Sequence, residues 1–549
     1  MGQPASSLRQ TPALLTLPDA LTGAALVAYV AAVLFGPIVD GHDTWLSFSH
    51  IHTWANALRA GDWVSVWTPL DANGFGSPVP FFYHKLFNLL AAALTLATGD
   101  AVTAARLTLL LFSAAMFFGV SQCAARLGAD ARSRHLVAIA SLLSPYAVLC
   151  ITERGAYAEY SAMTLVPYGI ALTLDFFQRR AGVRQAVAVF VLLLLIAVAH
   201  VVTFVFADGL LLVCAVWLVA RAPRQGLPLL VAAVAATVAF LTLIYVPFVV
   251  WSVYFCPGQA RLHGLVADNA VAFYRIFSPT PGSWFGWPVA TLAAGLALQL
   301  RHRRGARAAT VIATGATACL LLVLTTRVAA PLWRLSPMFD FVQFPWRLLA
   351  VITPLAFVAF AGMIEGLKPP MKRNAQIALL AVSFLSAVGM LHSLKGVFTL
   401  IPAAELREQN PAAGPGPDAG GEYFPARYQA KLAALPDLFK VGANAVLPAR
   451  RPLVESTGGC RSEAVAPVRY FRELRIGVRC GSDGVVQVNQ FDTPFLDVMA
   501  SGPNGAIVRP QGNTPFFTLP LARGQWEIRV RQRTYLELVS LAWQRKIHG

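Results

Sequence analysis

The stretch LLVAAVAATVAFLTLIYVPFVV, residues 229–250, contains no charged side chain and decides the class of fold. A helix needs about 20 apolar residues to cross the roughly 30 Å of hydrocarbon in a bilayer. Residues 20–39 and 346–365 form two further apolar stretches of about this length. The sequence therefore predicts a chain that crosses a membrane several times.

The composition agrees with a membrane protein. Of the 549 residues, 56% are hydrophobic and only 13% are charged, whereas charged residues make up about 25% of soluble globular domains. The mean hydropathy is +0.58. The formal net charge is +17, but the basic residues occur in short runs between apolar stretches and not along one soluble face. This pattern is typical of a topology signal, so we predict no nucleic-acid partner.

Five basic clusters predict the orientation of the chain. Between each successive pair the apolar sequence fits two crossings, so all five can face the cytoplasm. The clusters are Arg126, Arg132 and Arg134; Arg179, Arg180 and Arg184; Arg221 and Arg224; Arg301, Arg303, Arg304 and Arg307; and Lys368, Lys372 and Arg373. We predict a multi-pass protein of the bacterial inner (cytoplasmic) membrane, in contact with its lipids, with a cytoplasmic N-terminus and a periplasmic C-terminal domain.

About eleven crossings satisfy this orientation. They lie near residues 20–39, 101–122, 135–151, 161–177, 185–200, 205–220, 229–250, 284–300, 308–326, 346–366 and 375–394. Residues 86–98 are apolar but too short to span, so they predict a juxtamembrane helix on the outer surface. The two short crossings that meet at His200 have an alternative, a re-entrant hairpin, which leaves the orientation unchanged.

The chain divides into three parts. Residues 1–394 form the predicted transmembrane domain, with a long first outer loop at 40–100, and residues 395–454 form an irregular linker. Residues 455–549 show alternating runs such as RELRIGV and GVVQVNQF bounded by turn residues, which predict an exported β-sandwich or jelly-roll domain. Cys460 and Cys480 fall in this domain and are a candidate disulfide in an oxidising compartment.

The first outer loop gathers acids, histidines and tryptophans. A helix that begins near Asp43 places Phe48, Ile51, Ala55 and Leu58 on one apolar stripe, which we expect to lie on the bilayer. Asp43 and His50, seven residues apart, share another face. Two alternatives with a purely structural role stay open. Asp43 caps the helix, or the loop is an aromatic-rich interfacial segment that takes no part in catalysis.

Several motifs carry a family resemblance. The loop from GHDTW to FFYHKL resembles the first-loop signature of bacterial and archaeal membrane proteins called 6-pyruvoyl-tetrahydropterin-synthase-related, which are relatives of the C-type (GT-C) glycosyltransferases. Its elements fall on His42 and Asp43, Leu58 and Gly61, Trp67 and Pro69, Gly74 and Gly76, and Phe82, Tyr83 and Leu86. The segments ERGAYAEYSA at 153–162, QFPWRLL at 343–349 and GEYFPA at 421–426 fit in order. The chain departs from the pattern at Ser47, where the family usually carries a histidine.

The resemblance implies a GT-C-like fold and a glycosyltransferase. Such an enzyme transfers a sugar, with inversion, from a polyprenyl-phosphate donor to a glycan, lipid or protein acceptor on the periplasmic face. The chemistry needs a carboxylate that takes the acceptor's proton and cations that hold the leaving phosphate. We expect Asp43 to be the base, with Asp40 as the alternative. The expected phosphate ligands are Arg347, assisted by Arg154, Arg334 and Lys85, and the expected substrate-binding residues are His42, His50, Tyr83, Glu159 and His200.

We predict no cofactor. Some relatives with pyrophosphate-linked donors use a divalent cation, but the sequence contains no compact motif with metal-ligand spacing, so no metal ligands are predicted. Two other functions remain as alternatives. A lipid or glycan transporter would account for His200 and Asp208 in or near the membrane. A non-catalytic protein of envelope polysaccharide assembly would account for the departure at Ser47.

Overall fold

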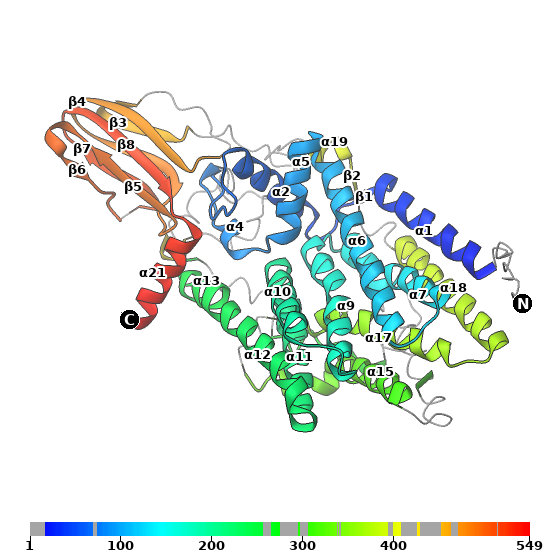
Figure 1. Cartoon of the computed structure of the whole chain (residues 1–549). Coiled ribbons are helices and arrows are strands. Elements are labelled where there is room, and N and C mark those ends of the chain that lie inside the picture. Colours follow the sequence, from blue (N-terminus) through cyan, green and yellow to red (C-terminus); the bar gives the residue numbers. More distant parts are fainter. Residues whose placement is uncertain are drawn as a thin grey trace, which may run out of the picture.

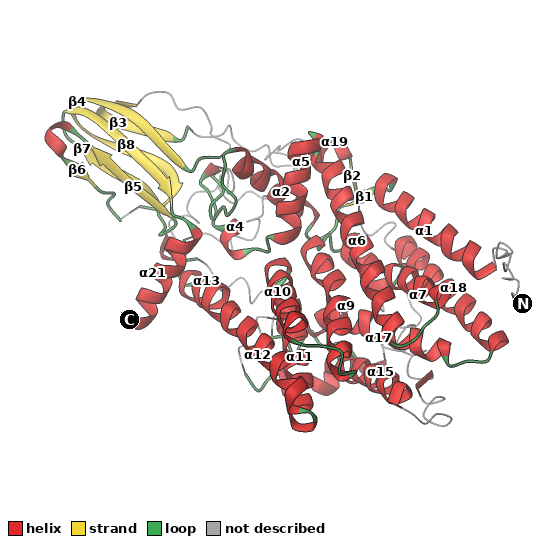
Figure 2. Cartoon of the chain, viewed as in Figure 1, coloured by secondary structure: helices red, strands yellow, loops and turns green. Residues whose placement is uncertain are grey.

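The structure is a computed structural model of the whole chain. It describes residues 17–69, 74–255, 265–274, 295–296, 306–336, 339, 342–393, 399–407, 425–428, 452–462, 470–512 and 514–548. Most of the crossing predicted at 284–300 and most of the predicted linker lie outside these residues. A bundle of helices forms one part of the molecule, and a β-sheet lies at the other end (Figure 1, Figure 2).

The helical bundle confirms a multi-pass membrane protein. Six of its described helices are long and apolar enough to cross a membrane, and a seventh is added if a bent pair counts as one span. The bundle contains these spanning helices together with shorter ones: α1 (Leu17–Phe35), α6 (Ala101–Arg126), α7 (Ala131–Leu142), α8 (Pro145–Ile151), α9 (Tyr157–Phe177), α10 (Val183–Ala199), α11 (Val201–Arg221), α12 (Pro223–Phe240), α13 (Val246–Ser252), α15 (Ala306–Leu324), α17 (Leu349–Glu365) and α18 (Pro369–Ser393). Helix α17 lies at the centre of the bundle. Of the most apolar 18-residue segment within Pro345–Glu365, 94% is buried inside the protein.

Two predicted crossings have an interrupted geometry. The span predicted at 135–151 is the pair α7 and α8, which meet at an angle of 47°. Ser144 caps α8 by accepting a hydrogen bond from the backbone N–H of Ala147, and Pro145 then occupies the first helical position. Helices α12 and α13 are joined by a π-helical turn at Leu241–Tyr245, so the predicted 229–250 span contains a local widening.

The first outer loop folds into short helices that pack against the bundle. They are α2 (Thr44–Arg59), α4 (Val79–Phe82) and α5 (Leu86–Thr98). The expectation that the stripe on α2 lies on the bilayer is wrong, because Phe48, Ile51 and Ala55 are at most 3% exposed. Phe48 and Ile51 belong to the core of the bundle, and Ala55 packs with Trp54 beneath α5. Apolar side chains at helical spacing are buried equally well by protein and by lipid, and the spacing does not distinguish the two.

The C-terminal part is an antiparallel β domain, as its alternating sequence predicts. Its strands are β3 (Val454–Ser462), β4 (Glu473–Phe491), β5 (Leu496–Ser501), β6 (Ile507–Val508), β7 (Phe516–Leu521) and β8 (Gly524–Gln532), followed by helix α21 (Tyr535–His548). They form one hydrogen-bonded sheet in the order β3-β4-β8-β5-β6. The long strand β4 pairs with β8 through its first half and with β7 through its second half. Cys460 and Cys480 are opposite in register and form a disulfide.

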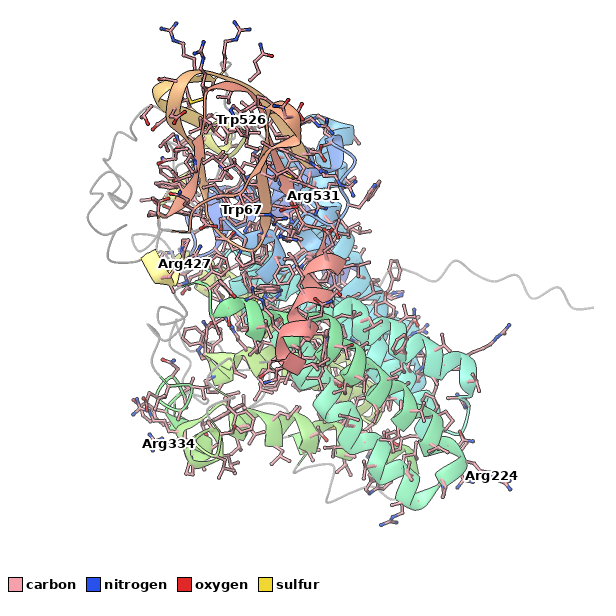
Figure 3. All side chains as sticks on the ribbon, turned by 90° about the vertical axis from the view of Figure 1, so that its left-hand side faces the viewer. Trp67, Arg224, Arg334, Arg427, Trp526 and Arg531 are labelled. Atoms are coloured by element: carbon pink, nitrogen blue, oxygen red, sulfur yellow. A yellow bond between two sulfur atoms is a disulfide. The ribbon has the colours of Figure 1, made fainter. Side chains whose placement is uncertain are left out.

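The β domain and the first outer loop share one hydrophobic core. Trp67 and Phe75 of the loop pack with Phe491, Phe495 and Phe516 of the domain. Figure 3 shows Trp67 among the side chains of the β domain. The loop is therefore held between the bundle and the β domain, and its conformation depends on both.

Helix α21 attaches the β domain to the π-helical turn of the bundle. The hydroxyl of Tyr535 donates a hydrogen bond of 2.8 Å to the carbonyl of Leu243, and the indole N–H of Trp543 donates one of 3.0 Å to the carbonyl of Thr242. A π-helical turn disturbs the regular backbone ladder and leaves carbonyls available to outside donors. The β domain is thus anchored to the bundle by specific hydrogen bonds as well as by apolar packing.

A candidate active site around Glu159

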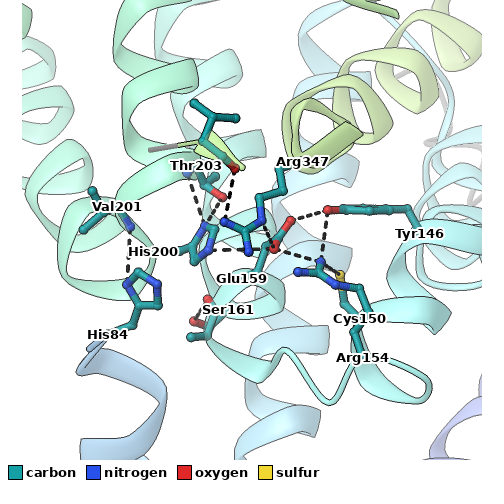
Figure 4. A network of polar contacts seen from close by, with 12 residues as sticks. His84, Tyr146, Cys150, Arg154, Glu159, Ser161, His200, Val201, Thr203 and Arg347 are labelled. Atoms are coloured by element: carbon teal, nitrogen blue, oxygen red, sulfur yellow. Dashed lines mark hydrogen bonds and ion pairs between the residues drawn. The ribbon is translucent and has the colours of Figure 1, made fainter. Parts of the chain in front are cut away.

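Glu159 lies at the centre of a buried polar network (Figure 4). It occupies the first turn of α9, and its side chain is 1% exposed. Its Oε2 accepts a hydrogen bond of 2.8 Å from Nη1 of Arg154, and its Oε1 accepts one from the hydroxyl of Tyr146. A carboxylate buried this deeply needs such partners, because desolvation of an unpaired charge costs several kcal/mol.

Two more cations or donors approach the same carboxylate from other elements. Nε2 of His200 lies 3.7 Å and Nε of Arg347 lies 3.9 Å from Oε2 of Glu159. Residues of four segments thereby surround one carboxylate: α8 with the turn that follows it, the start of α9, the junction of α10 and α11, and the turn before α17. The network is therefore a product of the bundle's packing.

His200 is held at the junction of two helices. It ends α10 and caps α11, where its Nδ1 accepts a hydrogen bond of 3.2 Å from the backbone N–H of Thr203 and lies 2.8 Å from the hydroxyl of the same residue. Its Nε2 faces Glu159. The ring of His84 lies beside it, with 4.4 Å between the ring centroids.

Arg347 is held in place by the backbone around it. It lies in the 3₁₀ turn η6 (Pro345–Leu348), and the preceding Phe344 is extended, as residues before proline generally are. Its Nη1 donates a hydrogen bond of 3.3 Å to the carbonyl of Val342. Its Nε is buried and has no hydrogen-bond partner among the described residues. Arg154 is fixed differently, with its guanidinium 4.8 Å from the ring centre of Trp346.

Asp43 is brought to this network by contacts between backbones. Its backbone N–H donates a hydrogen bond of 2.7 Å to the carbonyl of Arg154, and the neighbouring N–H of His42 donates one of 3.0 Å to the carbonyl of Glu153. Gly155 has a φ of +58°, and a Cβ there would collide with Thr44. The close approach of the two segments therefore requires glycine.

The carboxylate of Asp43 does not cap helix α2, although Asp43 stands at the N-cap position. Although Asp43 precedes α2, its side chain makes no capping hydrogen bond, so the structure does not support the capping alternative. Burial raises the pKa of the Asp43 carboxyl above its ordinary value, and the charges of Arg154 and Arg347 oppose that rise. The Asp43 carboxyl therefore combines a raised pKa with two nearby arginines.

A family model covers much of the region that carries this network. Residues 81–397 match the model of the 6-pyruvoyl-tetrahydropterin synthase related domain, described as a membrane protein. The chain belongs to this family. The match spans more than half of the chain and includes Glu159, His200 and Arg347, whereas Asp43 lies before it. The proposed resemblance to these PTPS-related membrane proteins is therefore confirmed.

Two proteins are among the matches to solved structures. A crystal structure of ArnT from Cupriavidus metallidurans bound to undecaprenyl phosphate is 18% identical to this PTPS-related chain, covers 71% of it and 67% of its own length, and superposes with a TM-score of 0.45. A cryo-EM structure of the arabinofuranosyltransferase AftD from Mycobacteria is 20% identical and superposes with a TM-score of 0.45. The alignment covers 68% of the PTPS-related chain and only 27% of AftD. No curated protein matches the chain by sequence.

Three other predicted site residues of the PTPS-related chain lie near the network but outside it. His50 is 2% exposed, its Nδ1 faces the amide of Asn88, and its ring packs on Tyr83 with 4.6 Å between centroids. Burial lowers the pKa of His50 to about 3. Lys85 donates hydrogen bonds of 3.0 Å and 3.2 Å to the carbonyls of Phe81 and Tyr83, and burial lowers its pKa to about 8.

The remaining predicted residues are placed elsewhere. Asp40 accepts a hydrogen bond of 3.1 Å from the hydroxyl of Thr399, where the short strand β1 (Ile38–Val39) pairs with β2 (Leu400–Ile401). His42 is exposed. The side chain of Arg334 is 61% exposed and lies 3.3 Å from Asp268, far from the β domain in Figure 3. The structure therefore does not bring Arg334 to the network, because the turn that carries it faces away.

Sequence reasoning did not single out three members of the network. Tyr146 and Thr203 lie inside apolar stretches, where a lone hydroxyl gives no signal. Trp346 is part of the QFPWRLL motif, but only its neighbour Arg347 was predicted as a site residue. The described residues contain no group of three or more His, Cys, Asp or Glu side chains that is arranged to hold a metal ion.

Proposed function

We propose that this PTPS-related protein is a membrane glycosyltransferase that uses a polyprenyl-phosphate-linked sugar. The single observation that carries the proposal is the placement of Asp43, a carboxylate with no capping bond, within electrostatic range of Arg154 and Arg347. A proton acceptor beside a fixed pair of cations is the minimum equipment for displacing a phosphate from a sugar.

Asp43 is the proposed general base. The hydroxyl or amine of the acceptor attacks the anomeric carbon of the sugar, and Asp43 takes the proton that the nucleophile loses. The bond between the anomeric carbon and the phosphate oxygen breaks, and its electron pair leaves with the polyprenyl phosphate. A single displacement of this kind inverts the anomeric configuration. Asp40 is a poorer base in this geometry, because its carboxylate is bound to Thr399.

Arg347 is the proposed principal ligand of the leaving phosphate. Its buried Nε lacks a hydrogen-bond partner among the described residues, and a planar guanidinium offers parallel donors to phosphate oxygens. Glu159 holds Arg154 and faces Arg347 and His200, so it orients the cations while neutralising part of their charge. Lys85 is a second candidate cation from the first outer loop.

The sugar is proposed to lie against the first outer loop. His50 presents a buried Nε2 that has no hydrogen-bond partner among the residues that the structure describes, and the ring of Tyr83 packs beside it. A donor buried without an acceptor costs about 1–3 kcal/mol, which a sugar hydroxyl at this position would recover. We place the site at the periplasmic face of the bacterial inner membrane, in agreement with the distribution of basic clusters. The acceptor is a glycan, lipid or protein of the envelope.

A deletion strain complemented with variants tests this function. We expect Asp43→Asn to abolish transfer of the sugar. The polyprenyl-phosphate-linked sugar donor should then accumulate, as measured by mass spectrometry of extracted lipids. Asp40→Asn is the matched control and is expected to retain transfer. Equal glycan and lipid profiles in the wild type and in Asp43→Asn would refute the proposal.

The phosphate assignment has a separate test. Arg347→Ala in purified protein is expected to weaken binding of undecaprenyl phosphate about tenfold or more, because a charged hydrogen bond to phosphate contributes roughly 1.5–3 kcal/mol. Arg334→Ala is expected to leave that binding unchanged. Equal losses in the two variants would show that the lipid is bound by surface charge and not at the network.

A further inference from the structure

Two cross-strand arginine pairs lie on the exposed face of the C-terminal sheet. Arg461 of β3 is opposite Arg479 of β4, and Arg475 of β4 is opposite Arg529 of β8. Like charges directly opposite each other destabilise a sheet unless a counter-ion lies between them. The two pairs differ in how this repulsion is relieved.

The pair Arg475 and Arg529 is neutralised within the protein. Glu473 accepts a hydrogen bond of 3.0 Å from Nε of Arg475 and one of 2.7 Å from Nη2 of Arg529. Glu527 adds a second carboxylate, 3.6 Å from Nη1 of Arg475. This pair therefore has no charge left for an outside partner.

The pair Arg461 and Arg479 has no such counter-ion in the part of the chain that the structure describes. Both side chains are exposed, and neither forms an ion pair with any residue that the structure describes. The disulfide between Cys460 and Cys480 joins the adjacent residues, so the register that sets the two arginines side by side is covalently fixed. Two guanidiniums are thus held together on the sheet, and no described acidic residue pairs with either of them.

The surface around this pair is open. Along β4, Arg479 is flanked on its own face by Gly477 and Gly481, which have no side chains. Its neighbour on β8 is Gln525, an exposed amide that adds neutral hydrogen-bonding groups. The pair lies close to the turn between β7 and β8, at the end of the sheet that points away from the helices (Figure 1).

We propose that the surface formed by Arg461, Arg479 and Gln525 binds an acidic glycan through the carboxylates of its sugar residues. Each guanidinium offers a fork of donors that matches a carboxylate, and the amide of Gln525 is suited to a neighbouring hydroxyl. A strand flanked by glycines leaves room for an extended polymer, and its position away from the helices favours a glycan over a lipid surface. The surface is separate from the network around Glu159, so it does not depend on the proposed transferase function.

Binding of polygalacturonate to the full-length protein in phosphatidylcholine nanodiscs tests this inference. We expect binding that weakens as NaCl rises, because exposed ion pairs are screened by salt. The double variant Arg461→Gln/Arg479→Gln is expected to bind about tenfold more weakly, which corresponds to about 1.4 kcal/mol. Retention of the Cys460–Cys480 disulfide, measured by mass spectrometry of unreduced peptides, shows that the variant domain keeps its register.

The chain supplies a charge-matched control. The double variant Arg475→Gln/Arg529→Gln removes the same charge from the same face, and its binding is expected to stay closer to that of the wild type. Equal loss in both variants would overturn the proposal, because binding would then follow net charge alone. So would failure of the wild type to bind polygalacturonate at low salt, or tighter binding to phosphatidylglycerol vesicles than to polygalacturonate.

Discussion

The indole N–H of Trp67 donates a hydrogen bond of 2.8 Å to Oε1 of Gln490, across 423 residues of chain. The amide of Gln490 in turn donates a hydrogen bond of 2.7 Å to the carbonyl of Gly74. The oxygen and the nitrogen of the buried Gln490 amide are thus both hydrogen-bonded to the first outer loop. The same loop carries Asp43, His84 and Lys85. The β domain therefore supports the loop that reaches the candidate active site.

Replacement of Gln490 by leucine is expected to destabilise the protein by roughly 2–4 kcal/mol. The variant leaves the indole N–H of Trp67 and the carbonyl of Gly74 buried without partners, and each such group costs about 1–3 kcal/mol. Thermal unfolding in detergent measures the effect. Gln525→Leu, at an exposed position of the same sheet, is the control and is expected to change stability by less than about 0.5 kcal/mol. Equal midpoints for the two variants would contradict the role assigned to Gln490.

Removal of the central carboxylate tests the network. Glu159→Gln leaves the buried Arg154 without its ion-pair partner, and we expect a loss of about 3–5 kcal/mol. Asp175→Asn provides a comparison, because Asp175 pairs with Arg126 at 2.8 Å where both side chains are partly exposed. That pair is expected to contribute only about 0–1 kcal/mol. A smaller loss for Glu159→Gln than for Asp175→Asn would mean that Arg154 finds another partner.

The pH dependence of transfer is expected to report the pKa of Asp43. A general base must be deprotonated, and burial raises the pKa of this carboxyl, so activity falls on the acidic side at a pH above the ordinary aspartate value. Arg154→Gln removes a charge that opposes the rise and is expected to move the acidic limb to still higher pH. Initial rates with a fixed donor, measured from pH 4 to 8, follow this shift. An acidic limb that moves to lower pH in Arg154→Gln would be inconsistent with Asp43 as the base.

Stability is expected to fall on mild acidification because of His50. Its pKa is about 3 in the folded protein and about 6.5 in the unfolded chain, so the unfolded chain binds the proton first. The contribution of His50 is complete above pH 6.5 and is lost as the pH falls from there toward 3, by about 1.4 kcal/mol for each pH unit. His50→Phe is expected to show a shallower dependence of its unfolding midpoint between pH 6.5 and 5. An unchanged slope would indicate that other groups dominate.

The β domain offers tests of both stability and orientation. Cys460 and Cys480 close a loop with a sequence separation of 20, so replacing both with serine is expected to cost about 3 kcal/mol. In cells with an intact inner membrane, an impermeant maleimide is expected to label the variant Ser501→Cys, because Ser501 is exposed on the β domain. Cys123, which is buried in α6, is the internal control and is expected to stay unlabelled. Labelling of Ser501→Cys only after the inner membrane is opened would reverse the proposed orientation.

Much of the bundle is predictable because hydropathy and charge are local properties. The apolar lengths locate α1, α6, α11, α17 and α18, and the short apolar stretch at residues 86–98 is helix α5 with the same bounds. The kink between α7 and α8 is harder to predict. Its signal, a serine followed by a proline, lies within an apolar run that reads as one span.

The candidate site was predictable only in its parts. The motifs around Asp43, Glu159 and Arg347 each predicted a separate site residue, and the structure places all three residues around one network. Arg334 had the same residue type and a similar place beside the membrane, yet it pairs with Asp268 at the surface. Residue type and position along the chain do not distinguish two arginines whose elements face opposite ways.

The sequence by itself determined a polytopic helical membrane protein with a C-terminal β domain, since apolar length, basic clusters and alternation act within a few residues of each other. Only the tertiary structure decided which face of α2 is buried, that Trp67 bonds Gln490, and that His200 and Arg347 meet at Glu159. Those contacts join elements that are far apart in the chain. They arise from how helices and sheet pack, and no local pattern specifies that packing.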